Sequence, residues 1–163
     1  MAETATVHAS AVLAGTRAVL IRGPAGAGKS RLALALIQAA DNGRIGFARL
    51  VGDDRLELAA AHGRLLVRPP QALAGLIEVR GLGIRRLDHE PVAVVGLVVD
   101  LGASGADRLP ETAEQEVVIE GIKLPRLTIG PGADPLPAVL ASLLTAPAEV
   151  WSLRPIAALP RER

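Results

Sequence analysis

One stretch near the amino terminus, Ala18–Leu34, limits what this chain can fold into more than any other segment. It consists of an apolar run, a glycine-rich turn, a Lys-Ser pair, and a segment rich in alanine and leucine. This order is typical of a strand, a phosphate-binding loop and a helix, and it fits the Walker A pattern G-x-x-x-x-G-K-[ST] in full. The stretch therefore predicts a nucleoside-triphosphate site within an α/β domain.

Each residue type of this loop has a physical role. Glycines let backbone N–H groups curl around phosphate oxygens, and the following helix directs its positive end at the same phosphates. Lys29 adds a charge for the β- and γ-phosphates, and the Ser30 hydroxyl is placed to hold Mg²⁺. The residues expected to bind the nucleotide are Gly23, Pro24, Ala25, Gly26, Ala27, Gly28, Lys29 and Ser30.

The length of 163 residues predicts one domain, large enough to bury a core without disulfides or metals. With one Trp, one Phe and no Tyr, that core must consist of Ala, Val, Leu and Ile. The absence of Cys excludes thiolate sites and fits a reducing compartment. We expect the domain to span residues 1–145, and the proline-interrupted residues 146–163 to form a tail.

Charge and hydropathy exclude several classes of partner. The net charge of +1 supplies no field for recruiting nucleic acid, and stacking aromatics are missing. The longest apolar runs, such as Val92–Val99, fall far short of the roughly 20 residues of a membrane helix. The N-terminus shows no export signal. We therefore expect a soluble, cytoplasmic protein without nucleic-acid or membrane partners.

Apolar periodicity and turn residues outline the other elements. The helix after the loop should end near Ala40, before an Asp-Asn-Gly cluster. A second helix is expected over Leu136–Leu144. The predicted strands are residues 4–13, Arg17–Arg22, Ile45–Gly52, the hairpin Leu56–Ala60 with Arg64–Val67, Leu76–Ile84, Pro91–Leu101, Val117–Glu120 and Ile122–Ile129.

Three acidic positions compete for the metal. Asp53 and Asp54 follow an apolar strand, and a carboxylate there can orient Mg²⁺ or accept a proton from an attacking hydroxyl. Asp100 ends another buried strand, as a Walker B aspartate does. Glu78 is the third candidate. Residue patterns alone do not separate Asp53, Glu78 and Asp100.

The segment Leu76–Ile84 is the most unusual one after the loop. In a strand, Glu78 and Arg80 would share one face, and two glycines follow at Gly81 and Gly83. This grouping favours a functional site over an exposed, ion-paired edge strand. The charged residues after it, from residue 85 to residue 90, are expected to form a solvated connection.

Two further residues have both a structural and a functional interpretation. His8 lies in the first predicted strand, where a half-buried histidine on a strand face is the favoured interpretation. Arg108 lies in a polar loop, where it could stabilise phosphoryl charge or simply face solvent.

Taken together and in this order, the motifs resemble the catalytic domain of the HPr kinase/phosphorylase family. That family shows a histidine in a strand just before the P-loop, the loop Gly-x-x-Gly-x-Gly-Lys-Ser, a paired aspartate after the next strand, the signature E-V/I-R-G-L-G-I, a D-R-L segment and an I-P-x-I-T-I-like strand. The corresponding segments here are Thr6–Ala9, Gly23–Ser30, Leu50–Asp54, Glu78–Ile84, Asp107–Leu109 and Leu124–Ile129.

The resemblance implies a fold, a reaction and an assembly. The fold would be a P-loop α/β domain with a strongly twisted mixed sheet, akin to that of phosphoenolpyruvate carboxykinase. The reaction would transfer the γ-phosphoryl group of ATP to a serine of HPr, the phosphocarrier of the sugar phosphotransferase system. Family members also run the reverse reaction, in which phosphate attacks phosphoserine. The family is typically a homohexamer, so we expect a homo-oligomer.

The resemblance also implies residue roles. By matched position, Asp53 would be the base that takes the serine proton, and His8 would sit beside it. Ser30 and Glu78 would hold Mg²⁺, and Arg108 would stabilise the transferring phosphoryl group.

By the same resemblance, Asp100 would be only a structural strand end. The chain departs from the family pattern at Arg31, where a glutamate is usual, and at Pro131–Asp134, where P-G-R-N is usual. Family members usually carry a separate N-terminal domain, whereas the resemblance here starts near the beginning of the chain. We therefore expect a short form made of the catalytic domain. The alternatives are a P-loop kinase of a small molecule, with Arg80–Arg86 as its only candidate lid cluster, and a nucleotide-binding sensor without catalysis.

Overall fold

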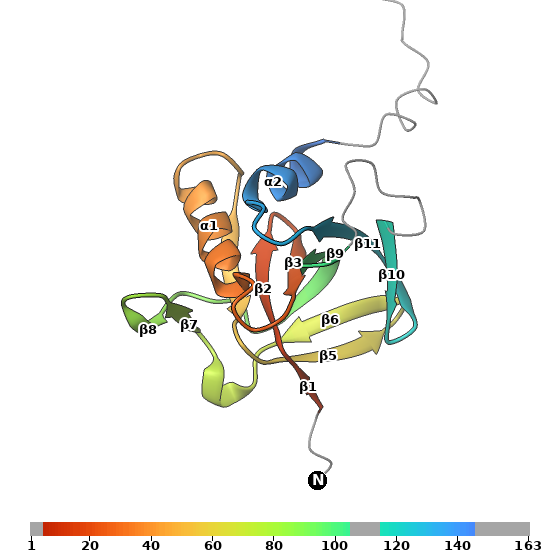
Figure 1. Ribbon diagram of the computed structural model, residues 1–163. Helices are drawn as coiled ribbons and strands as arrows, with labels where there is room; N and C mark the ends of the chain where they lie inside the picture. Colours follow the sequence, from red (N-terminus) through yellow and green to blue (C-terminus); the bar gives the residue numbers. More distant parts are fainter. Residues whose placement is uncertain (1–4, 105–114, 146–163) are drawn as a thin grey trace, which may run out of the picture.

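The computed structural model describes residues 5–104 and 115–145 (Figure 1). Arg108 and the predicted tail lie outside these ranges. The described elements are β1 (Thr6–Val7), β2 (Ala9–Ala14), β3 (Arg17–Arg22), α1 (Lys29–Asp41), β4 (Ala48–Gly52), β5 (Leu56–Ala61), β6 (Arg64–Arg68), a 3₁₀ turn (Gln71–Leu73), β7 (Leu76–Val79), β8 (Gly83–Arg86), β9 (Ala93–Leu101), β10 (Glu116–Ile119), β11 (Ile122–Ile129) and α2 (Leu136–Leu144).

The described residues form one nine-stranded sheet and a separate two-stranded sheet of β7 and β8. The main order is β1-β5-β6-β9-β3-β2-β4, and β11, which carries β10, also pairs with β9. Strand β9 runs parallel to β3 and β11 but antiparallel to β6, so the sheet is mixed. Figure 1 shows the sheet curling, with α1 and α2 on one face. This confirms the expected α/β fold with a twisted mixed sheet.

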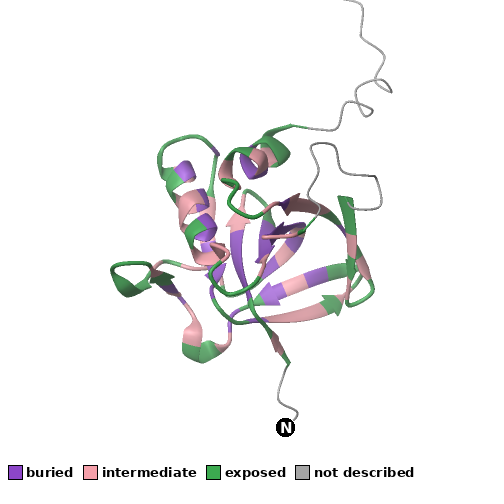
Figure 2. Cartoon of the chain, viewed as in Figure 1, coloured by how far each residue is buried: buried purple, intermediate pink, exposed green. Residues whose placement is uncertain are grey.

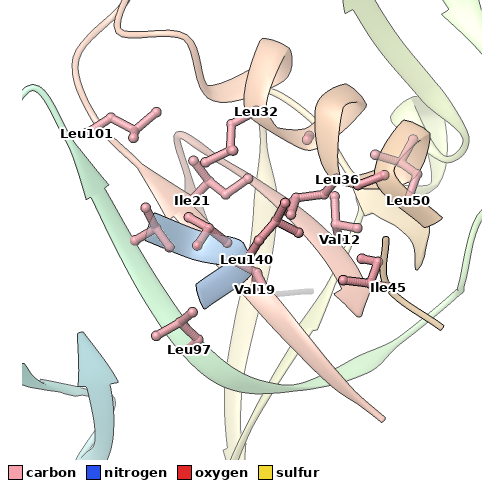
Figure 3. Packing of buried hydrophobic residues seen from close by; sticks show 14 of the residues in the cluster. Val12, Val19, Ile21, Leu32, Leu36, Ile45, Leu50, Leu97, Leu101 and Leu140 are labelled. Carbon is pink, nitrogen blue, oxygen red and sulfur yellow. The ribbon is translucent and has the colours of Figure 1, made fainter. Parts of the chain in front are cut away.

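Buried side chains form two clusters, one on each face of the central strands. In β3, Val19 and Ile21 belong to the cluster beneath α1 and α2, whereas Ala18 and Leu20 belong to the cluster on the opposite face. Figure 2 shows that burial concentrates in these central strands, and Figure 3 shows the α1 side of the core. Because side chains alternate between faces, a strand buried on both sides is an uninterrupted apolar run, as found before the P-loop.

Several predicted elements are confirmed. The helix after the loop ends at Asp41, one residue beyond the predicted end. The hairpin appears as β5 and β6, joined by His62 and Gly63, which both have positive φ. Helix α2 has the predicted bounds, Leu136–Leu144. Within residues 5–104 and 115–145, no helix is long and apolar enough to cross a membrane.

Other predicted strands need correction. The strand expected from residue 45 begins only at Ala48. The segment Leu76–Ile84 is a hairpin in which Arg80 lies in the turn, so Glu78 and Arg80 do not share a strand face. Gly81 and Gly83 have φ values of 85° and 88°, and this left-handed backbone reverses the chain. Arg85 and Arg86, expected to begin a solvated connection, are exposed but belong to strand β8, Gly83–Arg86.

Candidate active site

The P-loop joins the end of β3 to the start of α1. Gly26 and Gly28 have φ values of 80° and 98°, which glycine adopts without strain, and a Cβ at either position would meet nothing within 4 Å. Lys29 donates from Nζ to the carbonyl oxygens of Gly23 and Pro24, at 2.9 and 3.2 Å. The ammonium group is thus held over the loop, where it can reach a phosphate bound there.

Asp53, directly after β4, is the most heavily bonded carboxylate near this loop. It is only 4% exposed. The Ser30 hydroxyl lies 2.8 and 2.9 Å from its two oxygens, and the Ser10 hydroxyl donates to Oδ1 at 2.5 Å. The backbone N–H of Glu78 donates to Oδ2 at 3.1 Å. Three elements, β2, α1 and β7, therefore hold this carboxylate in place.

Ser10 is a site residue that sequence reasoning missed. It is fully buried in β2, on the face that also carries Val12, and its hydroxyl points at Asp53. A serine inside the otherwise apolar strand Ala-Ser-Ala-Val-Leu-Ala was the available signal. A buried hydroxyl needs a partner, but the pattern could not say which one.

His8 lies at the break between β1 and β2, not within a strand as predicted. Its Nδ1 is 3.9 Å from Oδ1 of Asp54, and the two side chains are 67% and 70% exposed. The favoured interpretation of a half-buried histidine is therefore wrong. The structure places His8 beside Asp54, whereas the resemblance placed it beside Asp53.

The sheet register explains this arrangement. Ala11 of β2 pairs with Gly52 of β4, so the residues before β2 and after β4 meet at one edge of the sheet. Asp54 has φ 69°, in the left-handed region. That turn lets two consecutive aspartates serve different surroundings: Asp53 is buried among hydroxyl donors, and Asp54 faces solvent beside His8.

Ser30 and Glu78, the two residues expected to hold Mg²⁺, both contact Asp53. Ser30 contacts Asp53 through its hydroxyl, and Glu78 contacts it through its backbone N–H. Within the described ranges, no three His, Cys, Asp or Glu residues are grouped so that they could hold a metal by themselves. Mg²⁺ is commonly bound by one or two carboxylates together with substrate phosphates, so the residues present fit an ion that arrives with a nucleotide.

Asp100 is engaged elsewhere. Arg22 donates to it from Nε at 2.7 Å and from Nη2 at 2.8 Å, and Arg126 donates from Nε at 2.6 Å. Burial alone would raise the pKa of this carboxyl, but the hydrogen bonds and charges of the two arginines outweigh it and hold the pKa below its usual value. These contacts agree with a structural role for Asp100. Arg108, the residue predicted to stabilise the transferring phosphoryl group, lies outside the described residues.

Comparisons with known proteins show which family this chain is similar to. The model of the HPr Serine kinase C-terminal domain matches residues 1–132. An HPr kinase/phosphorylase of Streptococcus thermophilus is 32% identical over 143 residues, covering 79% of this chain and 43% of the relative. A second, from Azoarcus sp., is 37% identical over 124 residues, covering 68% of this chain and 37% of the relative. The chain thus spans less than half the length of these curated relatives.

A solved structure extends the similarity to the fold. The Hpr(Ser) kinase/phosphatase from Coxiella burnetii superimposes with a TM-score of 0.67 at 27% sequence identity, covering 85% of this chain and 93% of that one. The family match, the curated relatives and the shared fold all point to one conclusion. The chain belongs to the HPr serine kinase C-terminal domain family.

Proposed function

We propose that this protein is an ATP- and Mg²⁺-dependent protein serine kinase whose substrate is HPr or an HPr-like phosphocarrier, and that it regulates phosphotransferase-dependent carbohydrate metabolism. The observation that carries the proposal is the division of the aspartate pair. Asp53 is bonded to Ser30 of the P-loop, and Asp54 is exposed beside His8. One carboxylate therefore adjoins the phosphoryl donor, and the other is open to an incoming protein.

We assign the proton acceptor to Asp54 in place of Asp53. A general base must come within hydrogen-bond reach of the hydroxyl it activates. Asp53 is buried and already accepts bonds from Ser10, Ser30 and the Glu78 N–H group. An exposed serine of a protein substrate reaches Asp54 far more easily, and His8 is placed to hold that carboxylate in position.

The other residues act on the phosphoryl donor. Lys29 and the loop N–H groups bind the phosphates, and Ser30 and Glu78 hold Mg²⁺, with Asp53 orienting the Ser30 hydroxyl. A Mg²⁺ ion held by these residues would supply positive charge to offset that of the phosphates. Arg108 keeps its predicted role in stabilising the transferring phosphoryl group.

Three further features remain proposals from the resemblance. The reverse reaction, attack of phosphate on phosphoserine, is supported by the names of the relatives, which include phosphorylase and phosphatase. The other two are a homo-oligomeric assembly, as in the hexameric members of the family, and a cytoplasmic location.

The test is to incubate the purified protein with labelled ATP, Mg²⁺ and HPr from the same cell, and to locate the label. We expect label on an HPr serine, and its loss with Lys29→Ala. Label on a small molecule would indicate a metabolite kinase, and ATP binding without transfer would indicate a sensor.

The same assay decides between the two aspartates. Asp54→Asn should lower kcat by about 10²–10⁴-fold, the usual contribution of a general base, with ATP affinity unchanged. Its stability should stay within about 0.5 kcal/mol because Asp54 is exposed and Asn tolerates positive φ. Asp41→Asn, an exposed change at the end of α1, is the matched control. A wild-type kcat for Asp54→Asn would refute the assignment.

A further inference from the structure

The hairpin of β7 and β8 ends in a segment that no described residue covers. Its base is anchored, because Ile77 is buried in the core beneath α1 and the backbone N–H group of Leu87 donates to the carbonyl oxygen of Gly75 at 2.8 Å. Beyond that base, residues 80–86, here called the arm, are all exposed. Figures 1 and 2 show the arm standing away from the main sheet. A segment with a fixed base and an open tip is suited to contact another molecule.

The arm presents apolar and positively charged side chains to solvent. Leu82 and Ile84 are each 63% exposed. The arm contains no acidic residue, and within residues 5–104 and 115–145 no ion pair involves Arg80, Arg85 or Arg86. Large apolar side chains gathered on an exposed segment mark an interaction surface. The arm therefore fits a partner surface that combines an apolar hollow with negative charge.

The hairpin of β10 and β11 offers a surface of this kind. Val118 is 65% exposed, and the exposed acidic residues Glu116 and Glu120 lie two positions to either side of it in the sequence. Glu116 pairs with Lys123 at 2.7 Å, whereas Glu120 has no ion-pair partner among the described residues. A cleft of about 280 Å³ lies beside this hairpin, lined by Gln115, Glu116, Lys123, Leu124 and Pro125. The hairpin thus supplies a hollow, an exposed valine and an uncompensated negative charge.

Charge and position decide how two copies of the chain can meet. A symmetric contact between two arms would bring the three arginines of each copy together, and like charges across an interface oppose association. In Figure 1 the arm and the β10–β11 hairpin lie on opposite sides of the molecule, so they do not meet within one chain. A contact between them joins different copies head to tail. Such heterologous contacts close into a ring when the rotation between copies allows it.

We propose that the arm of one copy docks on the β10–β11 hairpin of the next copy. Leu82 and Ile84 pack against Val118 and the cleft beside it, and the arginines of the arm face Glu120. The proposal rests on the homo-oligomeric assembly proposed above and names the two surfaces that form it. The arm begins two residues after Glu78, whose backbone N–H group donates to Asp53. Docking would therefore also steady the strand that helps to hold the buried carboxylate.

Charge reversal on each surface tests the contact. The arm variant combines Arg80→Glu with Arg86→Glu, and the hairpin variant is Glu120→Arg. Both change only exposed residues, so both should fold. Leu82→Ser removes an apolar contact without changing the charge, which gives an independent variant of the arm. Arg64→Glu is the matched control, because Arg64 is an exposed strand arginine without an ion pair among the described residues.

Sedimentation velocity over a series of protein concentrations measures the assembly of the full chain. We expect the arm variant and Glu120→Arg each to raise the dissociation constant by about 100-fold, because like charges then face each other across the interface. Combining the two sets of changes should bring the dissociation constant back to within about tenfold of wild type, since opposite charges face each other again. Leu82→Ser should weaken assembly, and Arg64→Glu should leave it unchanged.

A wild-type chain that stays monomeric at every concentration would overturn the proposal. So would an arm variant that assembles like wild type, or weakening by the arm variant that Glu120→Arg neither reproduces nor rescues. Labelling of HPr is measured separately. Assembly with the expected charge dependence in a protein that does not label HPr would keep the interface and refute the kinase proposal. Labelling of HPr by a monomeric wild-type chain would do the reverse, so the two failures are distinguishable.

Discussion

Replacing Ser10 with alanine tests the organisation of the site most directly. The hydroxyl of Ser10 is fully buried and donates to Oδ1 of Asp53 at 2.5 Å. The change Ser10→Ala removes one oxygen atom and leaves Asp53 with two donors, the Ser30 hydroxyl and the Glu78 N–H group. The carboxylate keeps its charge and its burial but loses one of three hydrogen bonds.

The expected loss of stability in Ser10→Ala follows from the type of contact that is removed. Hydrogen bonds to charged groups contribute about 1.5–3 kcal/mol, and the deleted oxygen leaves little empty volume. Since two donors remain on Asp53, we expect the free energy of unfolding to fall by about 2 kcal/mol. For a domain of this size each kcal/mol corresponds to a shift in Tm of about 2–4 °C, so Tm should fall by roughly 6 °C.

Urea and thermal unfolding of the two proteins measure this difference. Ser142→Ala, on the exposed face of α2, is the matched control and should change stability by less than about 0.5 kcal/mol. A double-mutant cycle with Asp53→Asn isolates the contact, and we expect a coupling energy above about 1 kcal/mol. Additivity within about 0.3 kcal/mol, or wild-type stability of Ser10→Ala, would refute the view that Ser10 holds Asp53 in place.

Two further predictions concern stability. Burial raises the pKa of Asp100, but the two arginines hold it below its ordinary value of 3.8, so the stability that its charge contributes is present above that pH and is lost as pH falls through the folded-state pKa. Asp100→Asn should lower the free energy of unfolding by about 1.5–3 kcal/mol at pH 7, the contribution of hydrogen bonds to a charged group. Urea unfolding should show this difference from wild type narrowing below pH 3.8, and a constant difference would contradict this. Gly52→Ala would place a Cβ 2.5 Å from Cδ2 of Leu56 and should cost about 1–3 kcal/mol in the same assay. Gly46→Ala, with nothing within 4 Å, is its control, and equal effects would contradict the packing argument.

Much of the fold could be predicted because its signals are local. The P-loop, the helix that follows it and the β5–β6 hairpin each depend on residues a few positions apart. Strand bounds were less reliable where glycines intervene. The pattern of Leu76–Ile84 predicts one strand in place of the hairpin of β7 and β8, since the sequence does not show that Gly81 and Gly83 adopt positive φ.

The partners of the site residues could not be predicted in the same way. Ser10 and Asp53 are 43 residues apart, and Arg22 and Asp100 are 78 apart. Such contacts depend on strand order and register, which no local pattern encodes. A shift of one residue between β2 and β4 would turn Ser10 to the other face of the sheet.

The sequence by itself determined that this chain carries a Walker A loop, because the spacing of Gly23–Ser30 fits that pattern in full. It also determined that two aspartates follow the strand beside that loop. Only the tertiary structure decided the surroundings of each aspartate. The pairing of β2 with β4 buries Asp53 under Ser10, and the left-handed turn at Asp54 exposes the second carboxylate beside His8. Adjacent residues of one type acquire different chemistry when the fold gives them different neighbours.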